Sequence, residues 1–193
     1  NGIAWIAGLE VPEGGVPAAD DPVFLKHQTL QEAVNRQDSA DVKLHIENGA
    51  DINETNKYGW TSLYCAANRR NADIVRLLLS RGAATDKADN RGKTALHVAV
   101  ERNQLEIVRM LAESGAPLPA ADSEGWTPLH HAAAHDYIEI AKYLVEKGAP
   151  VNALSNGGGT PLVDACGAGS AEMIEFLLDS GADPAIRTKA GKI

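Results

Sequence analysis

The stretch Gly125-Trp-Thr-Pro-Leu-His130 occurs in near copies along the chain. Gly92-Lys-Thr-Ala-Leu-His97 lies one 33-residue step before it, and Gly158-Gly-Thr-Pro-Leu-Val163 lies one such step after it. A Gly-Ala pair keeps the same step, beginning at positions 49, 82, 115, 148 and 181. Two independent marks with one period indicate stacked units that share one continuous core.

The 33-residue period, with its Gly-x-Thr-Pro-Leu-His and Gly-Ala-Asp phrases, resembles the ankyrin-repeat family. The resemblance covers residues 23–193. It implies an all-α solenoid of about five helix-turn-helix units joined by β-hairpin-like loops. These motifs are specific for the fold and carry almost no information about a partner.

The unit at residues 122–154 departs least from the family pattern. Gly125 lies at the expected hairpin tip, where glycine tolerates a positive φ. We expect Thr127 to cap the helix that follows, and the proline after it suits a first helical position because it has no N–H to lose. The apolar spacing then predicts an inner helix over about 128–135 and an outer helix over about 138–146.

Extending this register predicts five units, followed by the start of a sixth at 188–193; the five are residues 23–55, 56–88, 89–121, 122–154 and 155–187. The first unit is degenerate. It carries Lys26 in place of the tip glycine, Gln28 in the capping position and His45 in a leucine position. Because the end of a solenoid must present a solvent-compatible face, we expect this unit to be the N-terminal cap.

The two ends of the chain depart from the regular array. Residues 1–22 are rich in Gly, Pro and Ala and match no repeat, which favours a linker; the alternative is an extended segment that packs on the first repeat or in a neighbour's groove. The outer helix of the fifth unit keeps the apolar pattern of internal units, with Met173, Ile174, Phe176, Leu177 and Leu178. The chain also begins at Asn1 rather than Met. We therefore expect a fragment, with further repeats or another domain at the C-terminal end of the parent chain.

Charge and cysteine content limit the class of protein. The 193 residues include 26 acidic and 18 basic side chains, a net charge of -8, which argues against non-specific binding to nucleic acid or to an anionic membrane. No apolar run approaches the length of a membrane span. Cys65 and Cys166 hold different positions three repeats apart and are not expected to form a disulfide. Unpaired thiols favour the cytosol or the nucleus.

The histidines raise the possibility of a metal site. His131 and His135 are four residues apart, with Asp136 adjacent, but a zinc site needs three or four convergent ligands, so we expect no metal and at most a weak surface pair. The family resemblance implies that His97 and His130 are structural and bond within the Thr-Pro-Leu-His turn. No cofactor is expected.

Motifs for catalysis are also absent from the sequence. Gly157-Gly-Gly-Thr160 precedes a predicted helix, but no lysine follows, which favours a hairpin tip over a phosphate loop. Cys166 is expected to pack between helices as a small apolar residue. One register position holds Cys, Val, His and Asp in successive units, and residues one repeat apart cannot share a reaction centre; they are Cys65, Val98, His131 and Asp164.

Positions that vary between units are free to recognise a partner. The resemblance implies that partners contact the hairpin tips and the exposed side of the inner helices. There the second to fourth units carry aromatic and basic residues, the candidate partner-binding set: Lys57, Tyr58, Trp60, Arg69, Arg91, Lys93, Arg102, Trp126 and His135. Because Trp and Arg are typical of binding hot spots, this composition predicts a basic groove with aromatic anchors. The alternative is that each Trp shields its own hairpin and the basic residues are solvated.

The sequence thus predicts a non-catalytic interaction module that binds a partner protein segment on its concave face. The expected segment is acidic with apolar anchors; neither a membrane nor a nucleic acid is the expected partner. The alternative is a regulatory or substrate-recruiting domain of a larger enzyme, channel or transcription regulator.

Overall fold

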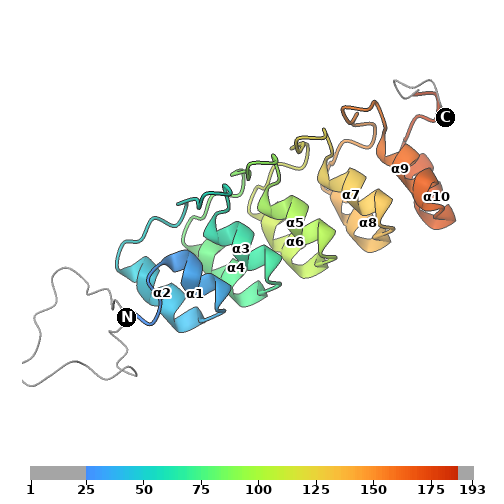
Figure 1. Cartoon of the computed structure of the whole chain (residues 1–193). Coiled ribbons are helices and arrows are strands. Elements are labelled where there is room, and N and C mark those ends of the chain that lie inside the picture. The colour runs from blue at the N-terminus through green and yellow to red at the C-terminus, as the bar shows by residue number, and fades with distance from the viewer. Residues whose placement is uncertain (1–24, 187–193) are drawn as a thin grey trace, which may run out of the picture.

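The computed structural model describes residues 25–186 as a row of helix pairs (Figure 1). Segments 1–22 and 188–193, which the sequence assigns to a non-repeat extension and to the start of a sixth repeat, lie outside the described residues. Within that range one pair of antiparallel helices falls in each 33-residue unit. Their bounds are α1 Leu30–Asn35, α2 Ser39–Glu47, α3 Ser62–Asn68, α4 Ala72–Ser80, α5 Ala95–Glu101, α6 Leu105–Glu113, α7 Pro128–Ala134, α8 Ile138–Glu146, α9 Pro161–Ala168 and α10 Ala171–Asp179.

The pairs stack side by side, and the connecting loops all project from the same edge of the row (Figure 1). The inner helices α1, α3, α5, α7 and α9 contact one another in order, and so do the outer helices α2, α4, α6, α8 and α10. Each unit therefore contacts only its neighbours, which is the arrangement of a solenoid. The predicted all-α fold of about five helix-turn-helix units is confirmed.

The core repeats with the same period as the sequence. Leu63, Leu96, Leu129 and Leu162 of the inner helices are buried, and the outer helices bury Leu78, Leu111, Leu144 and Leu177 in the matching row. Small alanines at one inner-helix position, including Ala99 and Ala132, have no exposed surface. Small side chains there let adjacent helices approach closely.

The loops are short hairpins rather than extended strands. In each regular unit a backbone bond joins the first residue of the tip to the residue four positions on, as in Asp122 N to Trp126 O at 2.9 Å. Gly125 has φ +80, and a Cβ there would lie 2.5 Å from the backbone nitrogen of Asn156 in the next hairpin. Glycine is thus required both by the backbone conformation and by the close approach of the neighbouring unit.

The first unit uses polar residues where the others use the repeat motif. The capping residue of α1 is Thr29, whose side chain accepts from the backbone N–H of Glu32, so the expectation that Gln28 occupies the cap is wrong by one position. The buried Asp41 carboxylate accepts from the backbone N–H groups of Lys26 and His27 at 3.0 and 2.9 Å. These bonds fix the backbone that precedes α1, in a unit that lacks the tip glycine.

Cys166 is exposed, which contradicts the expectation that it packs between helices. Its counterparts in the preceding units, Ala67, Val100 and Ala133, are fully buried. Each of those lies on a helix that packs against the inner helix of the next unit. No inner helix follows α9 among residues 25–186, so the same position there stays open.

Candidate functional site

The hairpin tips are held by one side chain at a fixed register position. Asp122 Oδ1 accepts from the backbone N–H groups of Glu124 and Trp126 at 2.9 and 3.0 Å, and Asp89 makes the matching bonds in the third unit. Asn56 does the same in the second unit. This Asx-turn geometry fixes the direction in which the tip residues leave the array.

The side chain at a second register position forms a hydrogen bond to the hairpin of the next unit. His97 Nδ1 accepts from the backbone N–H of Thr94 at 3.2 Å, so its Nε2–H donates to the carbonyl oxygen of Trp126 at 3.1 Å. His130 repeats this pattern: its Nδ1 accepts from the backbone N–H of Thr127 at 3.1 Å, and its Nε2–H donates to the carbonyl oxygen of Gly159 at 3.2 Å. The predicted structural role of both histidines is confirmed. In the second unit Tyr64 takes the place of histidine, and its hydroxyl donates to Asp89 at 3.0 Å.

Burial controls the protonation of these groups. Burial lowers the pKa of His97 to about 4, and the neighbouring His131 adds to the effect. Burial, followed by the charge of Asp89, raises the pKa of Tyr64 above its ordinary value. Both side chains are therefore neutral near pH 7 and act as hydrogen-bonding links between repeats.

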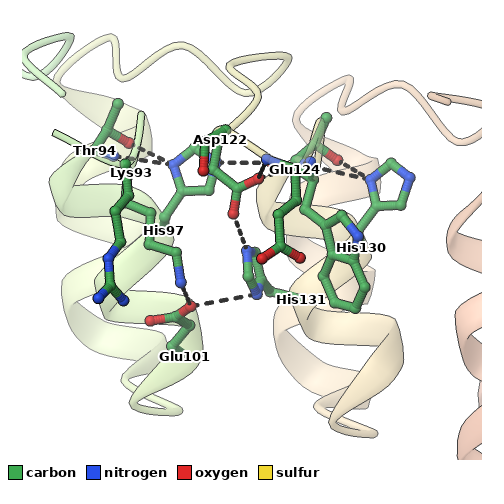
Figure 2. Close-up of polar contacts among 12 residues, drawn as sticks. Lys93, Thr94, His97, Glu101, Asp122, Glu124, His130 and His131 are labelled. Atoms are coloured by element: carbon green, nitrogen blue, oxygen red, sulfur yellow. Dashed lines mark hydrogen bonds and ion pairs between the residues drawn. The ribbon is translucent and has the colours of Figure 1, made fainter. Parts of the chain in front are cut away.

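His131 belongs to a polar network that joins the third and fourth units, with His131 and Asp122 buried and Lys93 and Glu101 half-buried (Figure 2). Its Nε2 lies 3.1 Å from Asp122 Oδ2, and its Nδ1 lies 3.4 Å from Glu101 Oε1. Glu101 also binds the Lys93 ammonium group. Burial lowers the pKa of His131, and the two carboxylates offset part of this effect. Burial acts to raise the pKa of Asp122, but bonds from two backbone N–H groups and from His131 lower it below its ordinary value.

This network corrects the interpretation of His131 and His135 as a weak surface pair. The His131 ring is buried and is directed towards Glu101 and Asp122. His135 is exposed, caps the C-terminus of α7, stacks on Tyr137 and donates from Nδ1 to the backbone carbonyl of His131 at 2.9 Å. No cluster of three or more metal-ligating side chains occurs in the described part of the chain.

The two tryptophans pack on their own hairpins and are only partly exposed. Trp60 stacks on Tyr64 with ring centroids 5.2 Å apart and lies 5.3 Å from Tyr58. Trp126 lies 5.1 Å from the ring of His131. Much of the surface of both rings is therefore used within the repeats, as in the alternative that each Trp shields its own hairpin.

A cleft of about 330 Å³ lies between the second and third hairpins, and we call it the hairpin cleft. The aromatic rings of the second unit form one part of its lining, and charged side chains of the third unit form another; its residues are Tyr58, Trp60, Tyr64, Asp89, Asn90, Arg91, Lys93 and Glu101. Four of the nine candidate residues meet in this cleft, namely Tyr58, Trp60, Arg91 and Lys93. Lys57 lies beside it, with its ammonium group 5.0 Å from the Tyr58 ring centroid.

The remaining candidates lie elsewhere. Arg69 and Arg102 cap the C-termini of α3 and α5, at the opposite end of the inner helices from the hairpin tips. Trp126 belongs to the fourth hairpin and does not line the hairpin cleft. The structure thus brings only part of the predicted basic groove together in one place.

Sequence reasoning missed Tyr64, Asp89 and the pairing of Glu101. Tyr64 holds the register position of His97 and His130, so a polar aromatic residue at that position was a signal for a link to the next hairpin. Glu101 is the last residue of α5. Its pairing with Lys93 was not visible in the sequence because the two are eight residues apart, across the capping turn of α5.

Comparison with known protein families identifies the family of this chain. The family described as ankyrin repeats (3 copies) matches residues 30–122 and 117–188. The chain belongs to the ankyrin-repeat family, whose members are generally protein-interaction modules. A comparison with curated proteins found no match. Among the described residues, no helix has both the length and the apolar character that crossing a membrane requires.

Proposed function

We propose that the chain is a non-catalytic interaction module that binds a partner protein segment on the hairpin tips and inner helices of its second to fourth units. The nine candidate residues remain the proposed contact set, with the hairpin cleft at its centre. Family membership supports a protein partner, and burial raises the pKa of Cys65 to about 11, which keeps this thiol protonated and unreactive near pH 7.

The observation that carries the proposal is the composition of the hairpin cleft. Aromatic rings from one unit face charged side chains from the next across a hollow that no part of residues 25–186 fills. Trp60 presents its free surface there, and such rings provide large contact area at low cost in conformational entropy. An apolar or aromatic side chain of the partner fits this part of the cleft.

Arg91 determines the preferred charge of the partner. Lys93 is already paired with Glu101, so it contributes little net charge to the cleft. The Arg91 side chain is exposed and has no ion-pair partner among the described residues. A guanidinium group binds carboxylates in a bidentate manner, so an acidic residue next to the apolar anchor completes the proposed ligand.

The test compares three forms of the chain as bait in cell extract: the unaltered protein, Trp60→Ala with Arg91→Gln, and Arg81→Gln. Arg81 is an exposed residue that caps the outer helix α4, so its replacement changes the charge without touching the cleft. We expect a protein that is retained by the first and third forms. Its affinity for the double variant should be lower by about 2 kcal/mol, in the range of hot-spot losses. Equal affinity of all three forms at equal helix content would contradict the proposal.

We also propose that the chain is a regulatory or substrate-recruiting domain of a larger protein in the cytosol or nucleus, with further repeats or another domain at its C-terminal end. A groove of about 480 Å³ on α9 and α10, lined in part by Leu162, Val163, Ile174 and Leu178, supports this. In every earlier unit the same face is covered by the next unit. Expression of a longer natural chain with a sixth unit tests it: protection of α10 amides from exchange should then rise to the level of α8.

A further inference from the structure

The inner helices of the first three units all end in an arginine. Arg36, Arg69 and Arg102 are the C-capping residues of α1, α3 and α5, and each is exposed. They recur with the 33-residue period, so they hold one register position along the stack, and we call them the arginine row. The row lies at the opposite end of the inner helices from the hairpin cleft.

Two of the three arginines lean towards the preceding unit and bind a neutral side chain there. Arg102 donates from Nε and Nη2 to Asn68 Oδ1 at 3.2 and 2.9 Å, and Arg69 donates from Nε to Asn35 Oδ1 at 3.5 Å. Because an arginine has five N–H donors, these bonds engage only a minority of the donors of either residue. They hold the two guanidinium groups between neighbouring units without neutralising them.

Carboxylates close to the row in sequence have other partners. Asp38 caps α2 and pairs with Lys26, and Glu101 pairs with Lys93. Within residues 25–186, none of the three arginines forms an ion pair. Arg70, which follows Arg69 in a left-handed conformation with φ 61, adds a fourth exposed positive charge. A protein of net charge -8 thus concentrates uncompensated positive charge along one line.

The spacing of the row matches one type of backbone. Adjacent packed helices are roughly 8–10 Å apart, and α1, α3 and α5 contact one another in this order. A polyproline II helix has three residues per turn and rises about 3.1 Å per residue, so residues i, i+3 and i+6 lie on one face at about 9 Å intervals. In a β-strand, by contrast, residues i and i+3 point to opposite faces.

We infer that the arginine row binds an acidic protein segment in a polyproline II conformation, with a carboxylate at every third residue. Each carboxylate meets the guanidinium group of one repeat, and the proline-like backbone loses little entropy on binding because it is already extended. A protein segment is favoured over a nucleic acid because the net charge of the chain repels a continuous polyanion. The inference rests on the proposed function and refines it, because Arg69 and Arg102 belong to the proposed contact set and Arg36 extends their part of it into a surface of its own.

The test uses the whole chain and a synthetic peptide, acetyl-(Asp-Pro-Ala)₄-amide, in a titration followed by amide chemical shifts at low salt. The reference is an isomer of the same composition with the four Asp residues adjacent. We expect shifts at the row and tighter binding of the periodic peptide. Because exposed ion pairs are weak individually, the variant Arg36→Gln, Arg69→Gln, Arg102→Gln should bind it about tenfold more weakly.

A second triple variant controls for overall charge. Lys43, Arg81 and Lys147 are exposed residues of the outer helices or their C-caps, and replacing all three by Gln removes the same charge from the other face. This variant should bind the periodic peptide within about twofold of the unaltered chain, allowing for screened long-range attraction. Arg102→Gln alone should weaken binding about threefold, and it serves if the triple variant fails to fold.

Three results would overturn the inference: equal binding of both peptides, equal loss in both triple variants, or displacement of the peptide by single-stranded RNA of matched charge. None of these results affects the part of the proposed function that the hairpin cleft carries, because the cleft contains none of the three arginines and is tested separately with Trp60→Ala and Arg91→Gln. Conversely, loss of the cleft interaction in extract would leave the peptide titration unchanged.

Discussion

The Nε2 atom of His97 lies 3.1 Å from the carbonyl oxygen of Trp126, a residue of the next repeat. The other ring nitrogen of His97 accepts from Thr94, which begins the helix that carries His97. One imidazole thus caps its own helix and holds the neighbouring hairpin in place. His130 makes the same pair of contacts one repeat further on, so local helix formation and repeat stacking are coupled along the array.

Replacing His97 with Ala should destabilise the array by about 1–3 kcal/mol, because the carbonyl of Trp126 and the N–H of Thr94 lose their partner in a buried setting. Urea unfolding, followed by circular dichroism, measures the change in the free energy of unfolding. His135→Ala is the control, since His135 is exposed and makes only a local bond to its own helix. Equal effects of the two substitutions would show that the contact to the next hairpin contributes nothing.

The low pKa of His97 predicts loss of stability in acid. Burial lowers the pKa of this imidazole to about 4, from 6.5 in the unfolded chain. The unfolded state therefore binds more protons between these values, so the contribution of His97 is complete above about pH 6.5 and disappears as the pH falls to about 4. The difference amounts to about 3 kcal/mol for this buried group. Unfolding free energies of the unaltered chain and of His97→Asn should converge over this range, and a constant difference between them would contradict the assignment.

The contribution of Asp164 to stability should depend on pH in the opposite sense. Burial raises the pKa of its carboxyl to about 6, and Oδ2 has no hydrogen-bond partner within the described range. The folded state then holds a proton that the unfolded state releases between pH 3.8 and about 6, so stability falls as the pH rises through this window. Asp164→Asn should therefore be more stable than the unaltered chain at pH 7, with little difference at pH 3.5. A less stable Asn variant at pH 7 would mean that the carboxylate has a stabilising partner.

The sequence was sufficient to predict the repeat architecture, because helix caps, tip glycines and core leucines recur with one period. The outer helix of the fourth unit was predicted over about 138–146, and α8 spans Ile138–Glu146. Such local signals depend on residues within one unit, where spacing alone defines the geometry.

The candidate site was predicted less well, because its contacts join different register positions of adjacent units. Comparing the same position in successive repeats set His131 beside Val98 and Asp164, whereas its partners are Glu101 of the third unit and Asp122 of its own hairpin. Lys93 was assigned to a basic groove although Glu101 neutralises it. Ion pairs of this kind depend on side-chain direction, which periodicity does not specify.

Gly125 and Gly148 allow a matched test of hairpin packing. Both have positive φ, +80 and +91, but a Cβ at Gly125 would meet backbone of the next hairpin, whereas at Gly148 nothing lies within 4 Å. Gly148→Ala should cost only the left-handed backbone strain, about 1–2 kcal/mol. Gly125→Ala should destabilise the array by clearly more, since the fourth and fifth hairpins must separate. Similar losses of unfolding free energy for the two variants would indicate that the hairpins do not pack as the structure shows.

The fifth unit should be the least protected of the regular repeats in the isolated chain. Its outer helix α10 buries Met173 and Leu177 against α8 and α9, but Leu178 remains 42% exposed and Cys166 is open on α9. A solenoid unit is stabilised mainly by its two interfaces, and residues 25–186 supply only one of them here. Amide exchange of α9 and α10 should therefore be faster than that of α5 to α8 under identical conditions, measured in a dilute monomer.

The first unit is the internal comparison, since it also has a single repeat interface but carries the polar bonds of Asp41. Its helix α2 should exchange more slowly than α10, and uniform protection from α5 through α10 would show that the fifth unit is complete without a further neighbour.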